Sequence, residues 1–217
     1  AAPLLHQSNL LIEADQMWSQ NPAIKGSGHA IAVLDTGVES SHEMFADESG
    51  DSRIAAEFCA STSYIDSDGV RVSWSFCPGE VATSSASGSG ADCPADVIGC
   101  GHGTHVAGIA AGSPVSVDVG TLSGVAPEAD IISVQVFSKF QDVAYCDSSS
   151  PCALSYSSDQ MLALEHVLSL QETNAHSIAS VNMSLGGAEY TENCDNESPA
   201  YLGVINNLAD AGVAVII

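Results

Sequence analysis

The stretch that decides the fold is GHGTHVAGIAAG, at residues 101–112. Its many Gly and Ala residues make it a poor surface helix but a good buried one, because small side chains permit close packing. His102 then lies at the start of the helix, where its imidazole can act as a general base if a carboxylate orients it. Two alternatives stay open for this segment. His102 is a buried, hydrogen-bonded histidine, or it binds a metal with His105, although no third ligand stands at a typical spacing.

Short apolar runs alternate with helical patterns along the chain. Near-continuous apolar runs indicate strands that are buried on both faces, as in a parallel sheet. The alternation predicts an α/β fold, with a doubly wound, mainly parallel sheet and helices on both faces. The expected strands are 30–34, 131–137, 179–185 and 213–217, and the expected helices are 102–111, 158–171 and 198–211.

Residues 46–99 do not follow this alternation, because Ser, Gly and Asp dominate much of the segment. We predict a Cys-containing surface insertion there, with short strands near 54–58 and 70–76. Within it, residues 66–69, Asp-Ser-Asp-Gly, resemble a calcium-binding loop, although Asp and Gly are also common in plain turns. We expect the chemistry to require no metal or cofactor, and we keep structural calcium as an alternative.

Composition excludes several classes of protein. The chain has 217 residues, of which 45% are hydrophobic, so a disordered chain is excluded. Its 27 Asp and Glu residues against 4 Lys and Arg residues disfavour a nucleic-acid partner, because the chain would repel phosphates. No apolar run is long enough to span a membrane, so we expect no membrane partner.

The seven cysteines lie in polar stretches, and none forms a CxxC pair. This placement favours disulfides and a secreted, extracellular protein, with free thiols in a cytosolic protein as the alternative. We predict at least two disulfides within residues 46–152, where Cys93 and Cys100, and Cys146 and Cys152, are close in sequence. The connectivity stays open. Because the number is odd, we expect Cys194 to be unpaired within the chain.

Two further motifs lie at strand ends. Asp35 ends the first apolar run and is followed by Thr36 and Gly37, at the position where ligands bind in open α/β sheets. A turn or helix-capping role is its alternative. Residues 181–187, VNMSLGG, run from a strand into two glycines, which let another backbone approach closely and suit an extended peptide. An ordinary strand end is the alternative here.

In this order and on these elements, the three motifs resemble the subtilisin-like serine proteases, the subtilase family. The resemblance implies a serine endopeptidase that cleaves peptide or protein substrates with a Ser-His-Asp triad. It also implies that Asp35 orients His102, that His102 is the general base and acid, and that His105 is structural. We expect substrate to lie between Ser184, Leu185 and Gly186 on one side and a segment near residues 155–157 on the other.

The sequence departs from the family pattern in two places. Met44 stands where the family commonly has a calcium-binding Asp, so that calcium site is in doubt. The family's Ala-Gly-Asn motif, which holds the oxyanion-binding Asn, and its Gly-Thr-Ser-Met-Ala motif, which holds the nucleophilic Ser, have no match in the chain. We therefore expect residues 1–217 to be a partial subtilase catalytic domain, incomplete at the C-terminus and inactive by itself.

Two other functions are weighed against the protease. One is a non-catalytic pseudoenzyme or peptide-binding fragment, because no acyl-enzyme forms without the serine. The other is a nucleotide-binding α/β protein, which is disfavoured because no Gly-rich phosphate-binding motif follows the first strand.

Overall fold

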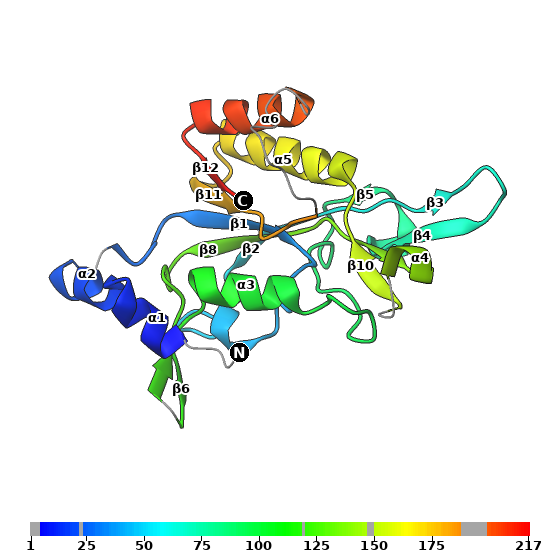
Figure 1. The fold of residues 1–217 in the computed structure, drawn as a ribbon. Coiled ribbons are helices and arrows are strands. Elements are labelled where there is room, and N and C mark those ends of the chain that lie inside the picture. Colours follow the sequence, from blue (N-terminus) through cyan, green and yellow to red (C-terminus); the bar gives the residue numbers. More distant parts are fainter. Residues whose placement is uncertain (1–4, 22–23, 119, 147–149, 188–198) are drawn as a thin grey trace.

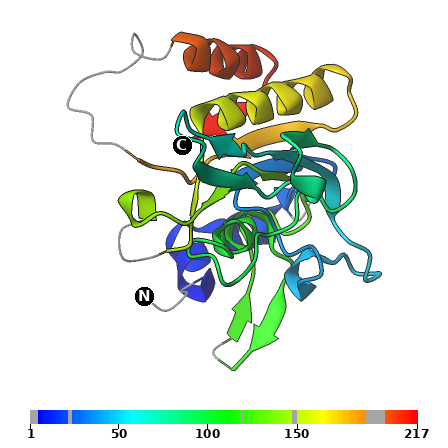
Figure 2. The same ribbon diagram turned by 90° about the vertical axis from the view of Figure 1, so that its right-hand side faces the viewer.

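A mainly parallel sheet lies between two layers of helices (Figures 1 and 2). The computed structural model describes residues 5–21, 24–118, 120–146, 150–187 and 199–217. Its helices are α1 (Leu5–Leu11), α2 (Ala14–Gln20), α3 (His102–Ala111), α4 (Val143–Cys146), α5 (Ser157–Glu172) and α6 (Pro199–Asp210), with short 3-10 helices at Glu43–Phe45 and Pro78–Glu80. Its strands are β1 (Ala30–Asp35), β2 (Ile54–Ala60), β3 (Tyr64–Ile65), β4 (Arg71–Ser75), β5 (Thr83–Ser84), β6 (Val115–Val117), β7 (Gly120–Leu122), β8 (Asp130–Gln135), β9 (Ser138–Phe140), β10 (Cys152–Leu154), β11 (Ile178–Asn182) and β12 (Ala214–Ile216).

The central sheet has the strand order β12-β11-β1-β8-β2-β5. All its neighbouring strands are parallel except β2 and β5, which pair antiparallel. The register places Ala32 of β1 beside Ile132 of β8 and Val181 of β11. The predicted α/β fold with a mainly parallel sheet is therefore confirmed, and the four predicted strands and three predicted helices are present.

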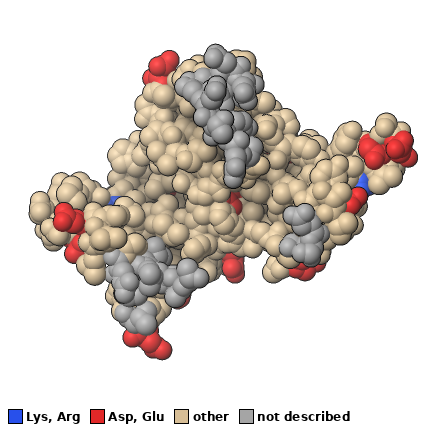
Figure 3. All heavy atoms as spheres, viewed as in Figure 1, with Lys and Arg blue, Asp and Glu red and all other residues tan. Residues whose placement is uncertain are grey.

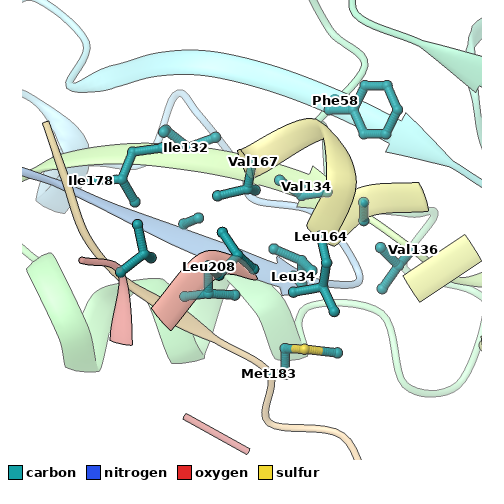
Figure 4. Packing of buried hydrophobic residues seen from close by; sticks show 14 of the residues in the cluster. Leu34, Phe58, Ile132, Val134, Val136, Leu164, Val167, Ile178, Met183 and Leu208 are labelled. Carbon is teal, nitrogen blue, oxygen red and sulfur yellow. The ribbon is translucent and has the colours of Figure 1, made fainter. Parts of the chain in front are cut away.

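Strand β1 is buried on both faces because its side chains alternate between two cores. Leu34 belongs to the core beneath α5 and α6, together with Ile132, Leu164 and Leu208, and Figure 4 shows side chains of this cluster. Val33 belongs to the opposite core, which α3 covers. Parallel strands are covered by helices on both faces, and this explains why β1 is a nearly continuous apolar run.

The prediction that residues 46–99 form a surface insertion is wrong for β2 and β5. Strand β2 lies inside the central sheet and pairs with β8, and β5 extends the sheet beyond β2. Strands β3 and β4 join β9 and β10 in a second sheet of order β10-β9-β4-β3, which projects to one side in Figure 1. The strands expected near 54–58 and 70–76 correspond to β2 and β4.

Three disulfides are present among the described residues: Cys59 with Cys77, Cys93 with Cys100, and Cys146 with Cys152. The prediction of at least two disulfides within residues 46–152 is confirmed. Cys194, which we expected to be unpaired, lies outside the described residues.

The molecular surface carries its charge unevenly. On the face shown in Figure 3, Asp and Glu lie mainly on projecting segments, including the end of the β3–β4 hairpin, and few Lys or Arg atoms are visible. Within the described part of the chain, we find no helix with the length and apolar character needed to cross a membrane.

Candidate active site

Asp35 and His102 meet where the central strand faces the first turn of α3. Asp35 is the last residue of β1, and His102 is the first residue of α3. The His102 Nδ1 atom lies 2.9 Å from both carboxylate oxygens of Asp35. The Asp35 side chain is fully buried, whereas 48% of the His102 side chain is exposed. The predicted contact between the two motifs is therefore confirmed.

Two glycines make this close approach possible. A Cβ atom on Gly103 would overlap the carbonyl oxygen of Gly37 and would crowd the Asp35 side chain. Gly37 has φ of 87°, a left-handed conformation that favours glycine, and a Cβ atom there would overlap the carbonyl of Ala91. The glycines of the two motifs thus bring the end of β1 against the first turn of α3.

The buried carboxylate of Asp35 accepts from the next backbone N–H, that of Thr36, and the neighbouring strand holds Thr36 in turn. The Thr36 N–H donates to Asp35 Oδ1 at 2.7 Å. Gln135 of β8, which is 1% exposed, donates its amide to the Thr36 carbonyl and accepts from the Phe137 N–H at 2.7 Å. Sequence reasoning missed Gln135, although a large polar residue in the mainly apolar run 131–137 is a signal for such a role.

The geometry determines which nitrogen of His102 is available. With Nδ1–H donating to the carboxylate, Nε2 keeps its lone pair and can accept a proton. Because the imidazole is half exposed and the carboxylate is buried, a reactant can reach His102 but not Asp35. This arrangement can transfer a proton to and from a group bound beside His102.

The structure does not support a metal pair at His102 and His105. His105 is exposed, and the described ranges contain no group of three or more His, Cys, Asp or Glu side chains that could hold a metal ion. The structural role that the resemblance implies for His105 stays a prediction.

The two places considered for calcium do not form a fitting site among the described residues. Asp66 accepts the N–H groups of Asp68 and Val70 with Oδ1, at 2.9 and 2.8 Å, in the turn between β3 and β4. Met44 is 8% exposed and packs in the core beneath α3. Its carbonyl accepts from the guanidinium of Arg53 at 2.8 Å, so a cationic side chain of the protein lies there.

The segments expected to bind substrate lie on the two sides of β1. Val33 pairs with Asn182 of β11, so the chain leaves β11 toward Ser184 at about the level where β1 ends. Ser184 and Gly186 are exposed, and Leu185 packs partly against the core. On the β8 side, Ser155 Oγ donates to the Val136 carbonyl at 2.7 Å.

A cavity of about 190 Å³ lies apart from the Asp35–His102 pair. Trp74 and Lys139 of the second sheet line it, together with Pro94 and Val97 of the loop that the Cys93–Cys100 disulfide closes. Neither Asp35 nor His102 lines this cavity.

The sheet order and the Asp35–His102 pair define a subtilisin-like α/β protein. The subtilase family model matches residues 26–217, and the chain belongs to this family. The major intracellular serine protease of Bacillus subtilis is 30% identical over 126 residues, which cover 58% of this chain and 28% of that protein. The structure of the Clostridium perfringens CspB protease matches with a TM-score of 0.57 and 21% identity, over 93% of this chain and 38% of that chain. This structural likeness supports the fold, and the chain spans less than half the length of either relative.

Proposed function

We propose that the protein is a serine-type endopeptidase in which Asp35 and His102 are catalytic residues. The observation that carries this proposal is the hydrogen bond from an accessible imidazole to a fully buried carboxylate through Nδ1. Membership of the subtilase family supports the reaction type.

In this proposal His102 moves one proton in each half of the reaction. Nε2 takes the proton of a serine hydroxyl as the serine oxygen attacks the peptide carbonyl, and then gives it to the departing amine nitrogen. Asp35 stays ionised, holds the ring in the required tautomer and stabilises the imidazolium that forms. Water then enters, and the same base assists hydrolysis of the acyl-enzyme. The nucleophile and the oxyanion donor are assigned to no residue of 1–217.

The proposed substrate is an extended peptide that lies across the carboxyl end of β1. The exposed residues Ser184 and Gly186, with Leu185 between them, would border it on the β11 side. The segment 155–157 would border it on the β8 side. Backbone hydrogen bonds to such edges suit peptides of varied sequence.

We propose that the protein works in an oxidising, extracellular compartment. The three disulfides support this location, because cytosolic proteins rarely keep structural disulfides. The Bacillus relative is named an intracellular protease, so the proposal assigns this protein to a different compartment from that relative. Fractionation of the source cells, with detection of the protein in the medium, tests this point.

The test of the catalytic proposal compares two histidines on one helix in the full-length protein. His102→Ala should lower the rate of casein hydrolysis by about 10³-fold or more, because triad members act as a unit. His105→Ala removes a similar, exposed ring from α3 and should change the rate by less than about threefold. A fluorophosphonate should label the wild type and inhibit it.

Each outcome of this comparison decides between the functions. Full activity of His102→Ala would refute the proposed base. A full-length protein that hydrolyses no peptide and takes no fluorophosphonate, yet binds peptide, would support the pseudoenzyme instead.

A further inference from the structure

Two threonine hydroxyls join the segment after β1 to the first turn of α3. Thr36 Oγ1 accepts the N–H of Gly103 at 2.9 Å. Thr104 Oγ1 accepts the N–H of Glu39, also at 2.9 Å. In each case the hydroxyl of one segment accepts from the backbone of the other, and each hydroxyl keeps its own proton to donate.

Both hydroxyl protons are directed to one carboxylate, that of Asp92. Thr36 Oγ1 donates to Asp92 Oδ1 at 3.4 Å, and Thr104 Oγ1 donates to Oδ2 at 3.5 Å. Asp92 Oδ1 also accepts the N–H of Gly101 at 3.0 Å and that of Cys93 at 2.9 Å. Thr36 follows Asp35 in the sequence, and Gly101 precedes His102. The Asp92 carboxylate therefore contacts a sequence neighbour of Asp35 and a sequence neighbour of His102.

Gly101 explains why the helix needs an acceptor from elsewhere. Gly101 is the N-cap residue of α3 and has no side chain with which to cap the helix. Thr36 Oγ1 supplies the missing acceptor for Gly103, the second residue of the helix, and Asp92 accepts the N–H of the cap residue Gly101 itself. The negative charge of Asp92 at a helix N-terminus is favourable. This hydrogen bond to a residue nine positions away connects the start of α3 to a different loop.

The backbone around Asp92 is itself anchored beside β1. The Asp92 N–H donates to the Val38 carbonyl at 3.3 Å, and the Cys93 N–H also lies 3.1 Å from the Thr36 carbonyl. The Cys93–Cys100 disulfide then closes the loop that returns to Gly101. These contacts fix the position of the Asp92 carboxylate. A residue that aligns two other groups needs such a fixed position.

We propose that Asp92 is a positioning residue that holds Asp35 and His102 in register by fixing the two threonine hydroxyls and the start of α3. The inference rests on the proposed function, and Asp92 acts through the neighbours of the pair. Burial raises the pKa of Asp92, and its hydrogen bonds oppose that shift. In the folded protein, hydrogen bonds from the chain therefore replace part of the water around the Asp92 carboxylate.

The experiment compares Asp92→Asn with Asp96→Asn in the full-length protein. Asp96 is exposed and lies in the same disulfide-closed loop, so its substitution changes the charge of the loop equally. Asp92→Asn keeps one oxygen acceptor but places an NH2 group against the second hydroxyl. We expect kcat on a peptide substrate to fall by about 10- to 100-fold with KM nearly unchanged, since a displacement of the order of 1 Å has this effect. Asp96→Asn should leave both parameters within about twofold of the wild type.

A second measurement, by proton NMR, reports on the Asp35–His102 hydrogen bond without a catalytic assay. The Nδ1 proton of His102 should give a downfield proton resonance through its bond to Asp35, and Asp92→Asn should shift or broaden it while Asp96→Asn does not. Equal kcat in the two variants, together with an unchanged resonance in Asp92→Asn, would overturn the proposal. So would a loss of kcat that is explained wholly by a lower unfolding midpoint. Activity of His102→Ala would instead refute the proposed function, and the resonance would still decide whether Asp92 positions the pair.

Discussion

Replacing Arg53 by Met tests how much stability rests on one buried cation beneath α3. The guanidinium donates to the carbonyls of Met44, Ala111 and Ala129 and to Ser113 Oγ, and the residue is 7% exposed. It thereby joins the loop before β2, the end of α3 and the loop before β8. Burial lowers the pKa of Arg53, and the nearby charges of Asp130 and Asp47 raise it again.

The magnitude follows from the carbonyls that lose their donor. Met44 O keeps the N–H of Ser113 at 2.7 Å, whereas Ala111 O and Ala129 O lose the guanidinium. An unsatisfied buried acceptor costs about 1–3 kcal/mol, so the two together cost about 2–6 kcal/mol. Removing a desolvated charge returns part of this cost. We expect the unfolding free energy to fall by about 3 kcal/mol, and Tm to fall by about 6–12 °C.

Arg71→Met is the matched control, because it removes the same charge by the same substitution. Arg71 pairs with Glu80 at 3.4 Å, and 39% and 57% of the two side chains are exposed. Exposed pairs contribute less than about 1 kcal/mol, so this variant should unfold near the wild type. Urea unfolding followed by circular dichroism measures both variants. An Arg53→Met protein within about 1 kcal/mol of wild type, or an equally unstable Arg71→Met protein, would refute the reasoning.

Three further predictions concern the site, the outer helix layer and the loops. Gly103→Ala should lower activity at least about tenfold by pushing α3 away from β1, whereas Gly108→Ala, where an added Cβ meets nothing within 4 Å, should be tolerated; equal activities would contradict this. His166 stacks on Phe58 with ring centroids 3.9 Å apart, and burial lowers the pKa of His166. The neutral ring therefore contributes stability above the pKa that histidine has in the unfolded chain, and this contribution is lost as pH falls below that pKa. Wild type should therefore lose more stability than His166→Phe when urea unfolding is compared at about pH 7.5 and about pH 5.5; parallel losses would be inconsistent with it. Alkylation without reductant, read by mass spectrometry, should leave the six paired cysteines unlabelled, and labelling of any pair would show that its disulfide is absent.

The Asp35–His102 pair could be predicted from sequence because each half is encoded locally. A buried strand that ends in Asp-Thr-Gly places Asp35 at the edge of the sheet, and a helix that begins at His102 places the ring at its first turn. The small residues that let these segments meet stand in the same two motifs. Local pattern and tertiary packing therefore agree at this point.

The place of β2 inside the central sheet could not be found in the same way, because its apolar run is interrupted. Glu57 stands in its middle and accepts the N–H of Gly88 at 2.7 Å, so the charged side chain remains partly exposed. Burial of Phe58, Cys59 and Ala60 depends on contacts that are distant in the sequence. Without that partner information, the polar flanks of the segment indicate a short strand in a surface insertion.

Local patterns also do not show what Gln135 and Asp92 contact. Gln135 reaches Thr36 across 99 positions, and Asp92 reaches the same residue across 56 positions. A sequence pattern can show that a polar residue is unusual in its run, but the fold alone supplies the donors and acceptors around it. Such residues are found only when the backbone is known.

The place of β1 in the sheet affects how long the site survives when the molecule opens. Two strands lie on one side of β1 and three on the other, so its amides exchange with solvent only after neighbouring strands have separated. Opening at β5 or β12 leaves both hydrogen-bonded ladders of β1 in place. The amides of Ala32 and Val33, which pair on both sides, are therefore expected to be among the last to exchange in deuterated water. The site that β1 leads into should outlast partial unfolding at either end of the sheet.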